Sequence, residues 1–158
     1  MIKNPPSNND DYIDSRDIEE RINDLESARD DFQSENDLPD YLNTEAPQNQ
    51  PAIIKNWTDE QAEKWGEWDD SDDGQELKVL LSLRDDLEGY CDDWRHGVTL
   101  IRESAWIDYC KDLVSDLGAL PRDLPEYIAG NINWEGVAED LQQDYTSAEF
   151  DGVTYWAR

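Results

Sequence analysis

An excess of acidic side chains is the feature that most restricts how this chain can fold. Its 158 residues carry 40 Asp and Glu against 13 Lys and Arg, which gives a formal net charge of −27. The excess runs along the whole chain, with a net charge of −16 over residues 1–79 and −11 over residues 80–158. A fold built from such a chain works against its own charge repulsion. We therefore expect it to be more stable in moderate salt than at low ionic strength.

The aromatic content indicates that the chain folds in spite of this repulsion. Apolar residues make up 37% of the sequence, a share that by itself would indicate disorder. Seven Trp and seven Tyr indicate the opposite, because disordered acidic chains are poor in aromatic residues. Each large ring can bury about 150–250 Å² of surface, so these residues can support a small core.

The charge also restricts the partners and the location of the protein. A surface coated with carboxylates repels nucleic acid and lipid head groups and attracts basic protein surfaces. Residues 1–14 lack the features of a signal peptide, and no apolar run approaches the roughly 20 residues that span a bilayer. Cys91 and Cys110 have no metal-binding spacing and are expected to be thiols. We expect a soluble cytoplasmic protein that binds the basic DNA- or RNA-binding groove of another protein, without direct contact to nucleic acid or membrane.

The pattern of apolar residues predicts an α+β fold, mainly helical with a C-terminal β-hairpin. We predict a disordered lead-in, an acidic helix with a Pro-containing linker, and a helical body that ends in the hairpin, over residues 1–13, 14–56 and 57–158 respectively. The first helix, over residues 14–33, has a narrow apolar stripe formed by Ile18, Ile22, Leu25 and Phe32. The stripe fits packing inside the monomer or pairing with a second copy, so a homodimer is possible.

Local signals mark the ends of several other elements. Helices are predicted over residues 58–68, 75–94, 103–117 and 134–141. Thr58 and Gln61 match a capping box, Gly118 is placed to end the helix before it, and Asn133 can cap the helix after it. The helix over residues 103–117 has an apolar face formed by Trp106, Ile107, Cys110, Leu113, Val114 and Leu117. Asp151-Gly152 is a two-residue hairpin signal.

No residue pattern favours an enzyme. Among 40 acids, some pair always has a catalytic spacing, so spacing identifies no general acid and base. His96, the only histidine, belongs to no nucleophile motif, and the chain has no phosphate loop or zinc cluster. The stretch from Asp69 to Gly74 partly fits a calcium loop, but the twelfth position holds Leu80 instead of Glu. We expect no metal and no cofactor. A hydrolase that uses buried carboxylates stays an alternative, and it requires a cleft.

Rows of carboxylates on the predicted helices are the remaining functional candidate. Asp108, Asp112 and Asp116 lie four residues apart and stack on one face, about 6 Å apart along the helix. Such a row can imitate the phosphates of one DNA strand. Solubility alone needs a net charge of only about 2–8. The predicted partner-binding surface comprises Asp108, Asp112, Asp116, Glu139, Asp140 and Asp144, followed by Glu19, Glu20, Asp24, Asp85 and Asp86.

The C-terminal third of the chain resembles a known family. Residues 106–158 contain the segments YCKDLVSDLG, LPEYI, NWEGVAEDL, DY and DGVTYW, at residues 109–118, 124–128, 133–141, 144–145 and 151–156. In this order they resemble the C-terminal part of the ArdA-type antirestriction proteins. The whole chain also looks like small acidic proteins of phages and mobile elements. The resemblance implies an elongated, often dimeric mimic of B-form DNA that occupies the DNA groove of Type I restriction–modification enzymes. The β-rich N-terminal region of that family is absent here.

Charge and resemblance together predict a non-enzymatic DNA mimic, encoded by a phage or mobile element, that inhibits a host defence enzyme. Such a protein would act in the cytoplasm of an infected or element-carrying bacterial cell. One alternative is an anti-CRISPR inhibitor that binds a nucleic-acid channel. Another is an acidic binding module for a basic host protein. A mimic competes with DNA, whereas a generic acidic binder need not.

Overall fold

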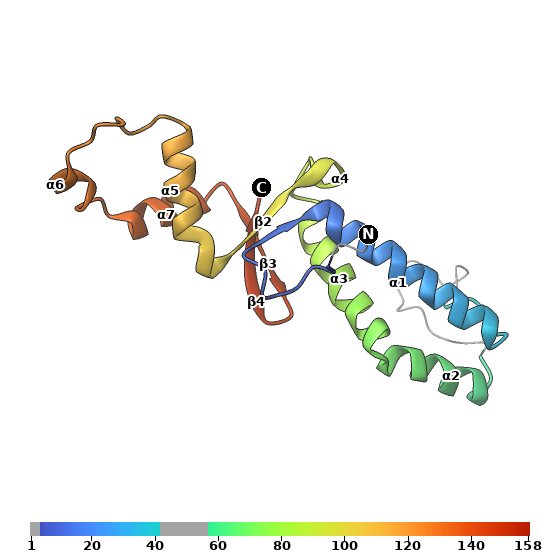
Figure 1. Cartoon of the computed structure of the whole chain (residues 1–158). Helices are drawn as coiled ribbons and strands as arrows, with labels where there is room; N and C mark the ends of the chain where they lie inside the picture. Colours follow the sequence, from blue (N-terminus) through green and yellow to red (C-terminus); the bar gives the residue numbers. More distant parts are fainter. Residues whose placement is uncertain (1–3, 42–56) are drawn as a thin grey trace. The chain divides into compact units, whose positions relative to one another are not determined.

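The computed structural model describes residues 4–41 and 57–158 (Figure 1). It confirms an α+β fold that is mainly helical and ends in a β-hairpin. The elements in chain order are β1 (Tyr12–Asp14), α1 (Ser15–Glu35), α2 (Asp59–Asp70), α3 (Asp72–Glu88), α4 (Trp94–Gly97), β2 (Thr99–Arg102), the 3₁₀ turn η1 (Glu103–Ala105), α5 (Trp106–Asp116), α6 (Glu126–Ala129), α7 (Trp134–Gln142), β3 (Thr146–Phe150) and β4 (Val153–Ala157).

The chain divides into two compact units. One combines Met1–Glu19 with Ser82–Arg158, and the other is Glu20–Leu81. This division differs from the predicted segments 14–56 and 57–158, since α1 and α3 each contribute residues to both units. Composition marks linkers along the chain, whereas these units are defined by segments that meet from distant parts of the sequence.

All four strands lie in the unit that holds both ends of the chain, in the antiparallel order β1-β2-β4-β3. The predicted hairpin is confirmed as β3 and β4. Its turn residues Asp151 and Gly152 both have positive φ angles, 46° and 80°, as a tight two-residue hairpin turn requires. Ala148 on β3 pairs with Tyr155 on β4, and both side chains are buried.

The N-terminal segment is ordered where disorder was predicted. Tyr12 and Ile13 of β1 pair with Ile101 and Leu100 of β2. Upstream of β1, the backbone carbonyl of Asp10 accepts a 2.6 Å hydrogen bond from the Tyr155 hydroxyl. The prediction of a disordered lead-in over residues 1–13 is therefore wrong for this part of it. Three residues are too short to show a strand periodicity, and their partner strand lies far along the chain.

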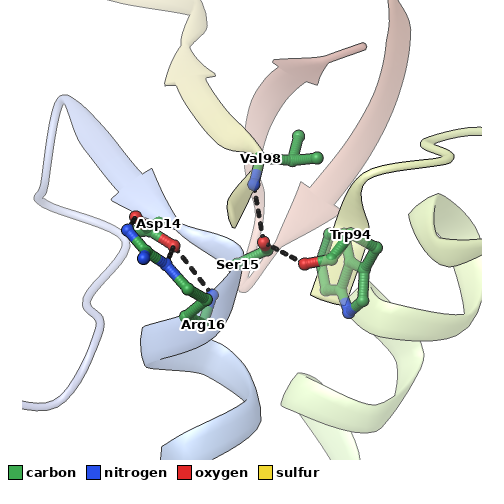
Figure 2. Close-up of polar contacts among 5 residues, drawn as sticks. All are labelled: Asp14, Ser15, Arg16, Trp94 and Val98. Atoms are coloured by element: carbon green, nitrogen blue, oxygen red, sulfur yellow. Dashed lines mark hydrogen bonds and ion pairs between the residues drawn. The ribbon is translucent and has the colours of Figure 1, made fainter. Parts of the chain in front are cut away.

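Ser15, at the start of α1, holds a buried polar contact (Figure 2). Its hydroxyl donates to the backbone carbonyl of Trp94 (2.5 Å) and accepts from the backbone N–H of Val98 (2.8 Å). The backbone N–H of Ser15 also donates to the carbonyl of Val98, at 2.9 Å. These bonds join the start of α1 to Trp94 in α4 and to Val98, the residue between α4 and β2. Next to them, Asp14 and Arg16 form a 2.6 Å ion pair.

We expect Ser15→Ala to lower the free energy of unfolding by about 1–3 kcal/mol, because it leaves the buried Val98 N–H without its side-chain acceptor. Urea unfolding measures the change. Ser147→Ala, at an exposed position of β3, is the matched control and is expected to stay within about 0.5 kcal/mol of wild type. Equal urea midpoints for the two variants would contradict a stabilising role for the Ser15 contact.

Helix boundaries in the unit Glu20–Leu81 follow local capping. The predicted capping box at the start of α2 is confirmed, with Thr58 and Gln61 hydrogen-bonded in both directions at 2.9 and 3.2 Å. α3 begins at Asp72 and not at the predicted residue 75, because the Ser71 hydroxyl accepts from the Gly74 N–H at 3.1 Å and starts the helix early. A side chain at Gly74 would collide with the backbone carbonyl of Trp68. The stretch compared with a calcium loop is thus helical on both sides of Ser71.

The apolar stripe of α1 packs inside the chain. Ile18, Ile22 and Leu25 are buried, and the Phe32 ring lies 5.7 Å from the ring of Trp68. This decides between the two predicted placements of the stripe in favour of the monomer. Part of the predicted linker packs as well, since the Tyr41 hydroxyl donates to Asp69 at 2.7 Å. The rest of that linker, residues 42–56, lies outside the described residues.

Candidate acidic interaction surface

Trp106 fixes the two helices that carry the main candidate residues. Its ring is 2% exposed and packs in a cluster with Ile101, Cys110 and Ala138. The indole N–H donates to the backbone carbonyl of Ala138 at 3.0 Å, which ties α5 to α7 directly. The Tyr145 ring meets the indole edge-on, with the ring centres 4.7 Å apart. α5 and α7 are therefore positioned by one buried aromatic residue.

Both helices have the caps that the sequence predicted. Gly118 follows α5 with a φ of +65°, and its N–H donates to the carbonyl of Ser115 at 3.0 Å. The N–H of Ala119 donates to the carbonyl of Val114 at 3.2 Å, which completes a Schellman motif. At the start of α7, Asn133 accepts a 3.1 Å hydrogen bond from the N–H of Gly136. The predicted C-terminal cap of α5 and the predicted start of α7 are confirmed. α5 begins at Trp106 and not at the predicted residue 103, because residues 103–105 form the 3₁₀ turn η1.

The acidic row on α5 is exposed along its full length. Asp108, Asp112 and Asp116 all face solvent, with a rise of about 6 Å between neighbours. Asp108, Asp112 and Asp116 follow Trp106 by two, six and ten residues, which places them about 200°, 240° and 280° around the helix from Trp106. The row therefore begins on the side away from the Trp106 contact and turns toward its flank at Asp116. Lys111 approaches Asp108 at 3.3 Å. Asp112 and Asp116 have no ion pair with any residue in the described part of the chain.

The acids on and after α7 are exposed as well. Glu139 and Asp140, the two residues after the buried Ala138 on α7, are both exposed. Asp144 lies in the turn after the helix, where its backbone N–H donates to the carbonyl of Leu141 at 3.2 Å. Within residues 4–41 and 57–158, none of these three carboxylates has an ion pair. The structure thus exposes all six main candidates, five of them on α5 and α7, which pack together, and Asp144 in the turn after α7.

The other five candidates lie on α1 and α3. The Glu19 carboxylate is half-buried and accepts the indole N–H of Trp94 at 2.7 Å, so it has an internal partner and is a poor choice for a binding surface. Asp85 and Asp86 are exposed on α3, and Asp85 lies 3.7 Å from Arg84. The last two, Glu20 and Asp24, are exposed on α1 and belong to the unit Glu20–Leu81.

Sequence reasoning missed Asp11 and Tyr12 next to the α5 row. The Tyr12 side chain is 49% exposed, and its ring lies 6.5 Å from that of Tyr109 on α5. Partial burial raises the pKa of the Tyr12 hydroxyl, and the charges of Asp112, Asp11 and Asp108 raise it further. Tyr12, the first residue of β1, therefore adds an aromatic ring beside the row, and Asp11, just before β1, adds a carboxylate that lies 3.9 Å from Arg102. The sequence could not predict this neighbourhood, because it depends on the pairing of β1 with β2, which lies far along the chain.

A cavity of about 350 Å³ lies between the end of α5, the connection after it and the start of α7. It is lined by Lys111, Ser115, Gly118, Leu120, Pro121, Arg122, Leu124 and Trp134. No carboxylate lines this cavity, so it lacks the paired acids that the hydrolase alternative requires.

Residues 4–41 and 57–158 contain neither a metal-binding cluster nor a membrane-spanning helix. Over these ranges, no group of three or more His, Cys, Asp and Glu side chains is placed to hold a metal ion. Nor does any helix in the same ranges combine the length and apolar character needed to cross a membrane.

Comparison of the chain with models of protein families, with curated proteins and with solved structures finds no match. The resemblance of residues 106–158 to the ArdA-type proteins therefore stays a prediction.

Proposed function

We propose that this protein is a non-enzymatic inhibitor that imitates DNA and occupies the basic DNA-binding groove of a defence enzyme. A Type I restriction–modification enzyme is the first candidate target. The observation that carries the proposal is the exposure of all six candidate carboxylates on and after α5 and α7. Five of them lack an ion pair among the described residues. Unpaired carboxylates on one small unit repel each other, and a cationic surface relieves that repulsion.

Carboxylates can replace phosphates in such a groove on chemical grounds. Both groups accept paired hydrogen bonds from the planar guanidinium of Arg and attract the ammonium group of Lys. On α5 the carboxylates are fixed by the helix, so their spacing does not depend on the partner. Binding of this kind is strongest at low ionic strength, since salt screens the attraction between the two surfaces.

The proposed inhibitor acts by occupying the DNA-binding groove of its target. One molecule blocks one groove, so the effect is stoichiometric and needs neither a cofactor nor a catalytic residue. The resemblance of residues 106–158 to antirestriction proteins supports this role. We place the protein in the cytoplasm of a bacterial cell that carries a phage or mobile element, and a homodimer is compatible with this role.

A competition experiment tests the proposal. The protein is titrated into a purified Type I methyltransferase bound to labelled DNA, at two salt concentrations. We expect stoichiometric displacement of the DNA that weakens as salt rises. Polyglutamate at equal total charge is the control, because it supplies carboxylates without a fixed arrangement.

Two results would change the conclusion. Equal displacement by polyglutamate would indicate a generic acidic binder and not a mimic. No displacement at either salt concentration would contradict a Type I enzyme as the target. The remaining candidates would then be the nucleic-acid channel of a CRISPR effector and a basic host protein.

A further inference from the structure

The connection between α5 and α7 is long, and its helix is not packed. α6 (Glu126–Ala129) has no buried side chain and lies at the outer end of the connection, away from α5 and α7 (Figure 1). Most connections in compact domains have about 4–6 residues, whereas this one runs over residues 117–133. Internal hydrogen bonds still shape it, such as that from the Asn131 side chain to the Tyr127 carbonyl at 2.7 Å. The backbone of α6 is therefore held by internal hydrogen bonds, while its side chains do not contribute to the core.

This segment also exposes large apolar side chains. Leu117 is 72% exposed, Tyr127 76% and Ile128 44%. We call Tyr127 and Ile128, which are adjacent on α6, the α6 patch. Leu117 was predicted to lie on the packed face of α5, yet α7 does not cover it. Only 37% of the residues are apolar, so few large apolar side chains are available for the core. Leaving three of them in solvent gives up the stabilising free energy that their burial would contribute.

Charges around the α6 patch indicate which kind of partner covers it. Glu126, next to the patch on α6, and Asp123, in the connection before α6, are exposed, and Arg122 is the single basic residue of the connection. A second copy of this chain would bring the same carboxylates into contact and oppose two bodies of charge −27. A basic protein surface would instead be attracted to this rim. Charge complementarity therefore favours a basic partner over self-association.

We propose that the α6 patch is the apolar anchor with which this protein docks beside the basic groove of its target. The inference rests on the proposed function and assigns a separate role to each part of the surface. The carboxylates speed the association with the partner and set its salt dependence. The Tyr127 ring, which becomes buried only in the complex, slows dissociation. The partner must then carry an apolar hollow next to its DNA-binding groove.

The test compares Tyr127→Ala and Ile128→Ser with wild type in binding to the Type I methyltransferase, at two salt concentrations. Tyr90→Ala is the matched control, since Tyr90 is 73% exposed in the same unit but distant in sequence from α6. We expect Tyr127→Ala to bind at least tenfold more weakly through faster dissociation. The ratio of the dissociation constants of Tyr127→Ala and wild type should be the same at both salt concentrations, because salt does not screen the free energy of burying an apolar ring. Tyr90→Ala should bind within about twofold of wild type.

Three outcomes would overturn the inference. If wild type, Tyr127→Ala and Ile128→Ser all displace DNA equally, the α6 patch is not an anchor, while the proposed function stands. If wild type displaces no DNA, the proposed function fails for this target and the inference falls with it. If sedimentation shows that the free protein self-associates and that Tyr127→Ala makes it monomeric, the α6 patch belongs to a second copy.

Discussion

Neutralising the whole α5 row, with Asp108→Asn, Asp112→Asn and Asp116→Asn in one variant, is expected to weaken DNA displacement by about 10- to 100-fold. Each exposed carboxylate contributes a few-fold to binding, and three of them act on the same groove. The dependence of displacement on salt should become shallower, because fewer charges are paired in the complex. The competition experiment at several salt concentrations measures both changes.

A variant with the same change of net charge separates local geometry from total charge. Glu60→Gln, Glu63→Gln and Asp70→Asn remove three exposed charges from α2, in the other unit. We expect this variant to displace DNA nearly as well as wild type. An equal loss in both triple variants would show that only the total charge matters, which is the behaviour of a generic acidic binder.

Single neutralisations should have small effects because the proposed surface is distributed. Asp112→Asn is expected to lower displacement by only a few-fold, since Asp108, Asp116 and the acids of α7 remain in place. The control is the folding of the variant, followed by circular dichroism. Complete loss of displacement by a folded Asp112→Asn protein would replace the distributed surface with a discrete site.

Replacing Trp106 with alanine is the second change with a large expected effect. Removing a buried ring of this size typically costs about 3–5 kcal/mol, and whole domains are stable by only about 5–15 kcal/mol. The variant also loses the hydrogen bond from the indole to Ala138 that joins α5 to α7. We expect a strongly lowered urea midpoint and loss of DNA displacement, although the net charge stays the same.

Trp106→Phe is the matched control, because it keeps an aromatic ring at the site while it removes the indole N–H. It should retain most of the stability and most of the displacement. If Trp106→Ala loses its native near-ultraviolet dichroism and still displaces DNA as wild type does, the arrangement of the carboxylates is irrelevant. The protein would then act as a flexible polyanion.

Interactions between near neighbours could be predicted from the sequence alone. The capping box of Thr58 and Gln61, the helix end at Gly118 and the turn at Asp151-Gly152 each depend on residues within about four positions of one another. Their stabilising free energies are properties of the local chain, so the pattern of residue types is enough to find them. The exposure of the acidic rows followed from the same local helical periodicity.

Tertiary structure decided the features that depend on distant pairs. β1 exists because β2 supplies its partner strand, and this pairing brings Tyr12 next to α5. Glu19 is an internal acceptor because Trp94, 75 positions further along the chain, points its indole N–H at the carboxylate. Leu117 lies on the apolar side of α5 by periodicity, yet it is exposed because no other element covers that end of the helix. A helical pattern shows which side chains can be buried together, but only the arrangement of the other elements determines which of them are.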